Sequence, residues 1–118
     1  MRQLTSAEFQ SFIEAKSAAA IHFDAEWDVA YRPLLRQEML EAEKELGDRA
    51  NFGEVDVDRY MELAKSVRLR SVPTVGYYRD GQLVALLPGC RQNVRGRLER
   101  VMRGEAIGRK DGYDDCPD

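Results

Sequence analysis

The stretch TVGYYRDGQLVALL, residues 74–87, limits the possible folds of this chain more than any other segment. It consists of two apolar runs that are joined by Asp80 and Gly81. Both positions of an Asp-Gly dipeptide tolerate a positive φ, so this dipeptide between apolar runs is one of the strongest short signals for a β-hairpin. The sequence therefore predicts two adjacent antiparallel strands near the C-terminal end of the fold.

Helical and strand patterns alternate along the rest of the chain. Extended segments are expected near Leu4, over residues 18–25 (AAAIHFDA) and over residues 51–57. Amphipathic patterns predict helices over residues 6–16, 33–46, 58–67 and 93–103. Helices between strands allow parallel crossovers, and the hairpin adds an antiparallel edge. This order predicts one α/β domain with a mixed sheet.

Several residues mark the ends of these helices. Thr5 and Glu8 form a T-x-x-E capping box, which starts the first helix. Asp58 stands where it would cap the short third helix. In the second helix, Gly47 supplies the stop after an apolar stripe spaced by four and three residues, namely Leu35, Met39, Ala42 and Leu46.

The length and the charge of the chain limit its domain count and its partners. Its 118 residues, 43% of them hydrophobic, suffice for one compact domain with a modest core, which is expected over residues 1–104. The polar residues 105–118 are expected to form a mobile tail. With 18 basic and 21 acidic residues, the net charge of −3 gives no polycationic signature for nucleic acid or an anionic membrane.

No segment has the properties of a membrane span or a signal peptide. No window approaches the about 20 apolar residues that a transmembrane helix needs, and MRQLTSAEFQ at the N-terminus lacks an apolar core. A cytoplasmic location is therefore the default expectation, with neither a membrane nor a nucleic acid as partner.

Five arginines lie in and around the last helix, at positions 91, 95, 97, 100 and 103. On a helical projection they mostly occupy the solvent side, around the stripe of Val94, Leu98 and Val101. Glu99 and Glu105 interrupt the positive charge, and no aromatic residues are interleaved for base stacking. A solvated face is therefore expected here, and a nucleic-acid site is not.

The chain contains only two cysteines, Cys90 and Cys116, and their separation fits neither a disulfide framework nor a zinc site. A structural disulfide between them is possible. Because Cys116 lies in the polar segment GYDDCPD, two separate free thiols are the favoured interpretation, as in a reducing compartment.

The sequence resembles the thioredoxin superfamily. The resemblance rests on IHFDAEW before a helix, on EVDVD at the end of the next strand, on SVPT, and on YYRDGQLVALLPG, in this order and at the spacing of the family. It covers about residues 1–104. It implies a thioredoxin-like fold, with a central mixed sheet of four to five strands, flanking helices and a C-terminal antiparallel hairpin.

The resemblance also shows what the chain lacks. The family carries W-C-x-x-C at the turn between strand and helix, and the two matching positions in WDVAY are Asp28 and Tyr31. The chemistry of the family is the attack of a thiolate on a disulfide, which a second thiol then resolves. Neither a carboxylate nor a phenol supplies that chemistry, so no catalytic residue is expected at this turn and an enzymatic function is not favoured.

The acidic residues around this turn allow two interpretations. Asp28 is expected to be a simple N-cap of the second helix, because a catalytic carboxylate usually needs a partner group. The nearby candidates for such a group are His22, Asp24 and Glu26. His22 is expected to be a satisfied strand histidine, and a metal site built from these four residues requires a strand that continues past Asp24. No metal and no cofactor are therefore expected.

The resemblance further implies a groove for a polypeptide. The family residue that matches Trp27 flanks the active-site rim, although a partly buried core aromatic is equally expected for Trp27. The family proline that matches Pro73 is cis and exposes the backbone of the preceding residue, Val72, for pairing with an extended peptide. The predicted partner groove consists of Trp27, Asp28, Tyr31, Val72, Pro73, Gly89 and Cys90.

The favoured function is a non-redox thioredoxin-like module, a chaperone or adaptor that holds a protein or peptide in the groove of the former active site. One alternative is a single-cysteine redox or glutathione-linked protein, in which Arg91 favours the thiolate of Cys90. Another is a structural subunit that assembles through the hairpin edge or an exposed helix. Because Pro33 lies earlier than the helix proline of thioredoxins, no peptide specificity is inferred.

Overall fold

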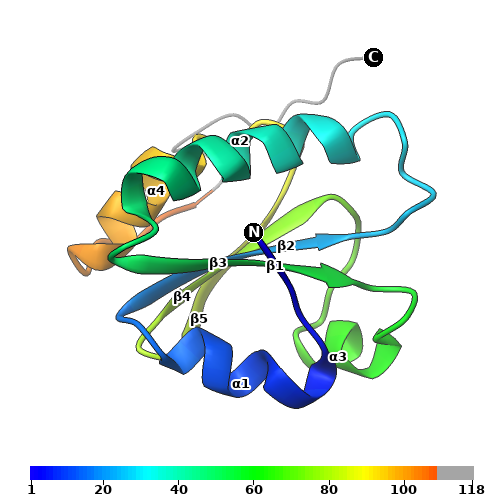
Figure 1. Ribbon diagram of the computed structural model, residues 1–118, viewed down its shortest axis with the longest axis horizontal. Helices are drawn as coiled ribbons and strands as arrows, with labels where there is room; N and C mark the ends of the chain where they lie inside the picture. Colours follow the sequence, from blue (N-terminus) through cyan, green and yellow to red (C-terminus); the bar gives the residue numbers. More distant parts are fainter. Residues whose placement is uncertain (109–118) are drawn as a thin grey trace.

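The computed structural model describes residues 1–108 as one mixed sheet with helices on both faces (Figure 1). The strands are β1 (Arg2–Gln3), β2 (Ala18–Asp24), β3 (Ala50–Asp56), β4 (Thr74–Arg79) and β5 (Gln82–Pro88). The helices are α1 (Ser6–Glu14), α2 (Arg32–Leu46), α3 (Met61–Ser66) and α4 (Val94–Met102). The predicted fold class, a thioredoxin-like mixed sheet with flanking helices, is confirmed.

The strand order in the sheet is β1-β3-β2-β4-β5. β3 is parallel to both β1 and β2, whereas β4 is antiparallel to β2 and to β5. The predicted hairpin is therefore the antiparallel edge of the sheet. Asp80 and Gly81 take φ values of 51° and 77°, as a two-residue hairpin turn of this kind requires.

Two hydrophobic cores lie on the two faces of the sheet. In Figure 1, α2 and α4 cover one face, and α1 and α3 lie on the other. All seven residues of β2 are buried, and successive side chains alternate between the two cores. Ala18 and Ala20 pack on the side of α2 and α4, and Ile21 and Phe23 pack on the side of α1. The end of β2 is thus held firmly from both sides.

The helix boundaries confirm one predicted cap and correct another. The capping box of α1 is present, and the backbone N–H of Thr5 donates to Glu8 Oε1 at 3.1 Å. Asp58 does not cap α3, which begins at Met61. Instead, Asp56 Oδ1 accepts hydrogen bonds from the backbone N–H groups of Asp58 and Arg59. These bonds form a turn of the Asx type that contains Asp58, so the helix starts only after this turn, with Tyr60 as its N-cap.

Arg97 departs from the expected solvent-facing arrangement of the arginines. It is 1% exposed, and its Nη1 atom donates to Gln92 Oε1 at 3.1 Å. The reason lies in its spacing, because position 97 is three residues after Val94 and four before Val101 and therefore shares their buried stripe. A charged side chain on that stripe is buried if its polar atoms find partners in the core.

The first four residues of the predicted mobile tail are held against α4. Glu105 pairs with Arg100 and Arg103, and the carbonyl oxygen of Gly108 accepts from Arg97 Nη2 at 3.1 Å. Ile107 packs against the core under α4. The predicted tail thus begins with residues that contact α4, and its remainder, residues 109–118, lies outside the described residues. Within the described chain, every helix is too short or too polar to cross a membrane.

Candidate functional site

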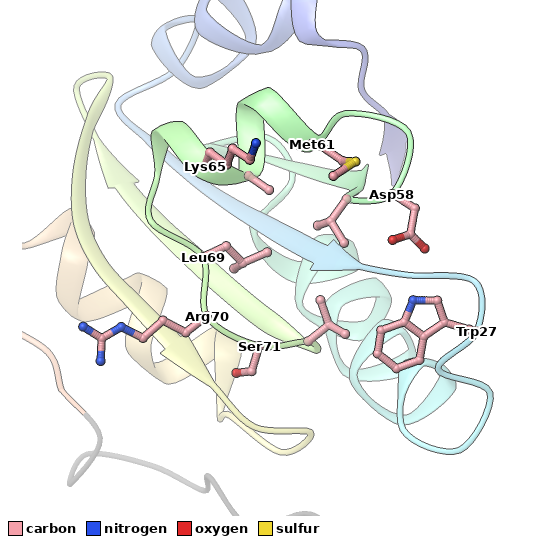
Figure 2. Close-up of a pocket in the computed structure, with 10 residues that line it drawn as sticks. Trp27, Asp58, Met61, Lys65, Leu69, Arg70 and Ser71 are labelled. Carbon is pink, nitrogen blue, oxygen red and sulfur yellow. The ribbon is translucent and has the colours of Figure 1, made fainter.

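An apolar groove of about 360 Å³ opens between α3, the loop 67–73 and the loop 25–31 that joins β2 to α2 (Figure 2). Trp27 forms one end of it, and Met61, Lys65 and Leu69 line the side that faces the tryptophan across the groove. The remaining lining residues are Val57, Asp58, Ala64, Arg70, Ser71 and Val72. A groove with apolar walls and a few charged groups at the rim suits a ligand that is largely apolar.

Exposed apolar side chains gather around this groove. Trp27 is 67% exposed and Met61 is 57% exposed, which rules out a core position for the tryptophan. Val29, in the same loop as Trp27, is 79% exposed, and Leu34 in the first turn of α2 is 41% exposed. Large apolar groups that cluster in water at one end of a small domain mark an interaction site more often than isolated ones do.

The segment that precedes β4 offers an open backbone beside the groove. The Val72–Pro73 peptide bond is cis, as the resemblance implied. Within residues 1–108, no backbone hydrogen bond involves the N–H or the C=O group of Val72. Both groups are therefore available to an extended chain that lies in the groove. The carbonyl oxygen of Pro73 already accepts from the N–H of Gly89 at 3.2 Å, which ties the segment before α4 to this loop.

Only some of the seven residues of the predicted groove line the observed groove. Trp27 and Val72 line the groove. Tyr31 is half-buried at the N-cap of α2, and Pro73 and Gly89 are buried beside the lining residues and are not part of it. The contribution of α3, through Met61 and Lys65, was missed. Exposed apolar residues on a short helix carry no periodic signal that separates them from ordinary surface residues.

Asp28 makes the predicted capping bond, but α2 begins later than expected for it. Asp28 Oδ1 accepts from the N–H of Tyr31 at 3.3 Å, and its carbonyl oxygen accepts from the N–H of Arg32. This single turn leads into α2, whose own N-cap is Tyr31 and whose first turn contains Pro33. Asp28 is 7% exposed, and its Oδ2 atom has no hydrogen-bond partner among residues 1–108. A buried acceptor therefore remains unused beside the groove.

A buried cluster of charged residues lies beneath the first turns of α2. His22 Nδ1 is 3.1 Å from Glu54 Oε2 and 3.9 Å from Asp24 Oδ2, and all three side chains are buried. Arg32 Nε donates to Asp24 Oδ2 at 2.5 Å, and Arg36 Nη2 is 3.3 Å from Glu54 Oε1. These five residues are called the loop cluster below, because they lie under the loop 25–31.

Burial and pairing move the two carboxyl groups of the loop cluster in opposite directions. Burial raises the pKa of Asp24, and the charge of Glu54 adds to this effect against the influence of His22 and Arg32. Burial also opposes the ionisation of Glu54, but the hydrogen bonds from His22 and Gln3 and the charge of Arg36 together lower the pKa of that carboxyl. The negative charge of Glu54, on β3, is thus better compensated than that of Asp24, on β2.

The loop cluster corrects the sequence interpretation of His22 in two respects. Its Nδ1 atom is hydrogen-bonded as expected, but its Nε2 atom is buried without a partner among the described residues. Since β2 ends at Asp24, the acidic residues Glu26 and Asp28 lie in the loop, and Glu26 is exposed. The acidic partner of His22 is instead Glu54, which was not predicted from the sequence as a site residue. It shares a face of β3 with Phe52, and a charged residue at such an inward position was the available signal.

The ligand atoms of His22, Asp24 and Glu54 lie within 4.8 Å of one another, close enough to be considered as metal ligands. Both carboxylates, however, are already neutralised by guanidinium groups, those of Arg32 and Arg36. A divalent cation would have to displace one of these arginines or add uncompensated positive charge to a buried site. The arrangement therefore favours a network of ion pairs.

Cys90 is a disulfide-bonded cysteine that is 1% exposed, so the expectation of two free thiols is wrong for this residue. The only other cysteine in the sequence, Cys116, lies outside the described residues. The expectation rested on the polar composition of the segment around Cys116, and composition does not determine whether a buried thiol is oxidised. Cys90 follows Gly89 and is therefore next to the segment that holds Pro73.

Comparisons with known proteins agree with this architecture. A model of the thioredoxin family matches residues 1–102. Thioredoxin from Plasmodium falciparum is 26% identical, with a TM-score of 0.72 over 90% of this chain and 100% of its own. Thioredoxin from Fasciola hepatica is also 26% identical, with a TM-score of 0.71 over 89% and 99%. The zinc-bound form of human ERp44 is similar in fold alone, at 19% identity and a TM-score of 0.62, covering 71% of this chain and 26% of that protein. No curated protein sequence matches the chain.

The family match spans nearly all of the described residues, and two thioredoxins are similar over almost their full length. The loop before α2, the cis proline before β4 and the hairpin follow one another along the chain in the same order as the motifs on which the resemblance rests. The chain therefore belongs to the thioredoxin family.

Proposed function

We propose that this protein is a non-redox polypeptide-binding module, a chaperone or adaptor that holds an extended, largely apolar segment in the groove between Trp27 and α3. The observation that carries the proposal is the combination of Trp27, 67% exposed at the end of the groove, with the unpaired backbone of Val72 beside it. An apolar side chain of a partner gains contact with Trp27, and its backbone gains hydrogen bonds at Val72.

The chemistry of the loop 25–31 supports binding without electron transfer. Asp28 and Tyr31 stand where the family has its two cysteines, and neither group attacks or resolves a disulfide. Cys90 is buried and already disulfide-bonded, so it offers no thiolate to a substrate in this state. The apolar groove persists although the dithiol is missing, and it is this retained surface that the proposal makes functional.

The test measures the binding of a permanently unfolded polypeptide, fluorescein-labelled reduced and carboxymethylated α-lactalbumin, by fluorescence anisotropy. Trp27→Ala should weaken binding about 30-fold, which is the effect of a central aromatic anchor in an interface. The same substitution should change the free energy of unfolding by less than about 0.5 kcal/mol, because the side chain is mostly in water. An insulin-reduction assay of the wild-type protein should show no turnover.

Leu83→Ala is the matched control, since Leu83 is an exposed apolar residue (42%) on β5, away from the groove. It should leave the affinity for the unfolded polypeptide within about twofold of the wild type. Equal losses in the two variants would mean that binding is nonspecific adhesion to apolar surface. Turnover of insulin at the level of a dithiol thioredoxin would contradict the proposal outright.

A further inference from the structure

The two ends of the loop 25–31 are joined by one side-chain contact. Asp24 is the last residue of β2, and Arg32 is the first residue of α2. Their side chains meet at 2.5 Å between Asp24 Oδ2 and Arg32 Nε. Within residues 1–108, no other hydrogen bond or ion pair links the residues just before the loop to those just after it. The bonds inside the loop, from Asp28 to Ala25 and from Val29 to Trp27, are local.

We propose that the Asp24–Arg32 ion pair is a latch that holds the loop 25–31, and with it Trp27, in the conformation that binds a polypeptide. This inference rests on the proposed function of the groove and adds the residues that position its main anchor. Neither Asp24 nor Arg32 lines the groove, so both act as positioning residues.

The surroundings of Asp24 explain why the latch requires a positive charge at position 32. The carboxylate is buried on β2 and is flanked by His22 from the same strand and by Glu54 from β3. Without Arg32, two carboxylates would remain close together in a buried site, and Arg36 and His22, which both contact Glu54, would have to compensate them. That arrangement is unfavourable, since like charges repel and burial weakens their solvation. The carboxylate and the start of α2 are therefore held together by charge.

The two partners of the ion pair are not held equally firmly, because Asp24 is anchored in the sheet and Arg32 is not. The carbonyl oxygen of Asp24 accepts from the N–H of Val57 at 2.9 Å, which fixes this residue to the end of β3. Arg32 is 25% exposed at its side chain and belongs to a helix that begins only there. Loss of the pair therefore leaves Asp24 in place and loosens the loop, while the buried Leu35 keeps the first turn of α2 on the core. Trp27 and Val29, which have few buried contacts, would become mobile with the loop.

The experiment compares Arg32→Gln with Arg36→Gln. Both substitutions remove one positive charge from the loop cluster and from the same helix, but only Arg32 spans the loop. Trp27 is the only tryptophan of the chain, so time-resolved fluorescence anisotropy reports the motion of this loop alone. Arg32→Gln should increase the amplitude of the nanosecond decay of Trp27 and weaken binding of the labelled carboxymethylated α-lactalbumin about tenfold.

Arg36→Gln should leave both readouts close to those of the wild type, and Arg32→Lys, which keeps the charge, should recover most of the affinity. Asp24→Asn serves as a second variant of near-identical shape if Arg32→Gln does not fold, and it should reproduce the larger amplitude. The latch is overturned if Arg32→Gln leaves the anisotropy decay unchanged, or if Arg36→Gln changes it equally. Absence of polypeptide binding in the wild type would instead refute the proposed function, because the decay of Trp27 tests the latch without any ligand.

Discussion

Two polar networks lie on the same face of the sheet, and they differ in how completely the buried side chain at their centre is hydrogen-bonded. The α4 network, formed by Glu38, Tyr77, Gln92 and Arg97, has its centre in the fully buried amide of Gln92. Its Oε1 atom accepts from Tyr77 and Arg97, and its Nε2 atom donates to the carbonyl groups of Leu87 and Gly89. No polar atom of the Gln92 side chain is left over.

The loop cluster and the loop above it each leave one buried polar atom without a partner within residues 1–108. His22 Nε2 has no partner among the described residues, and neither has Asp28 Oδ2 in the loop above it. Exposed apolar residues surround that loop, whereas the α4 network is covered by the chain itself. A fully paired buried amide such as that of Gln92 stabilises one structure, whereas unpaired buried atoms beside an apolar groove leave groups for another molecule. The comparison therefore separates a structural region from the region for which we propose binding.

The largest effect should come from breaking the α4 network. Gln92→Ala should lower the free energy of unfolding by about 4 kcal/mol, because it leaves several buried donors and acceptors without a partner. Chemical denaturation measures this loss. Arg91→Ala, at an exposed neighbouring position, should change stability by less than about 0.5 kcal/mol. If Gln92→Ala lowered the free energy of unfolding as little as this control, the α4 network would not be important for the stability of the fold.

Reduction of the disulfide at Cys90 should have the next largest effect. It should lower the free energy of unfolding by about 3 kcal/mol, since a disulfide limits the conformations of the unfolded chain. Binding of the unfolded polypeptide should remain unchanged under conditions where the protein stays folded, because Cys90 does not line the groove. Denaturation and anisotropy titrations with and without dithiothreitol measure both quantities.

A change in binding affinity on reduction would point to the other interpretation, in which Cys90 controls the groove through the segment that contains Gly89 and Pro73. Peptide mapping under non-reducing conditions identifies the partner of Cys90, and the only other cysteine that the sequence offers within one chain is Cys116. Cys90→Ser is the matched variant, and it should bind the polypeptide as the reduced wild type does.

The same contrast explains which features were predictable from the sequence. The hairpin at Asp80-Gly81, the capping box at Thr5 and the apolar stripe of α2 follow from local rules, because each depends on residues within one or two turns. The chemistry of the loop 25–31 was also accessible, since the missing cysteines are a matter of residue type. The general fold and the absence of a dithiol from this loop were therefore predictable.

The hydrogen-bond partners inside each polar network could not be predicted from the sequence. Glu54 is joined to Gln3 across 51 positions, and Glu38 accepts from the backbone of Val94 across 56. Such pairs are selected by the packing of helices on the sheet, and no local pattern contains that information. The burial of Arg97 shows the same limit in another form: its position on an apolar stripe was visible, but the acceptor on Gln92 that makes burial tolerable was not.

The smallest expected effect is a change in loop mobility with pH, and it distinguishes the two carboxyl groups of the loop cluster. Because the pKa of Asp24 is raised, the folded protein binds this proton more tightly than the unfolded chain does. Protonation of Asp24 therefore removes the charge that holds Arg32 without lowering the stability of the fold. Glu54, whose pKa is lowered, stabilises the fold above its ordinary value of 4.5, and this contribution is lost as the pH falls through the lowered pKa.

Acid should consequently loosen the loop in a protein that is still folded. The nanosecond amplitude of Trp27 should rise as the pH falls, with a midpoint above 3.8, the ordinary pKa of an aspartate. Asp24→Asn should show the larger amplitude already at neutral pH and lack this step, while its unfolding at lower pH, followed by circular dichroism, should still reflect Glu54. A wild-type protein in which the mobility of Trp27 changes only together with global unfolding would show that Asp24 and Arg32 belong to the structural part of the molecule, as Gln92 does, and that the loop has no latch separate from the fold.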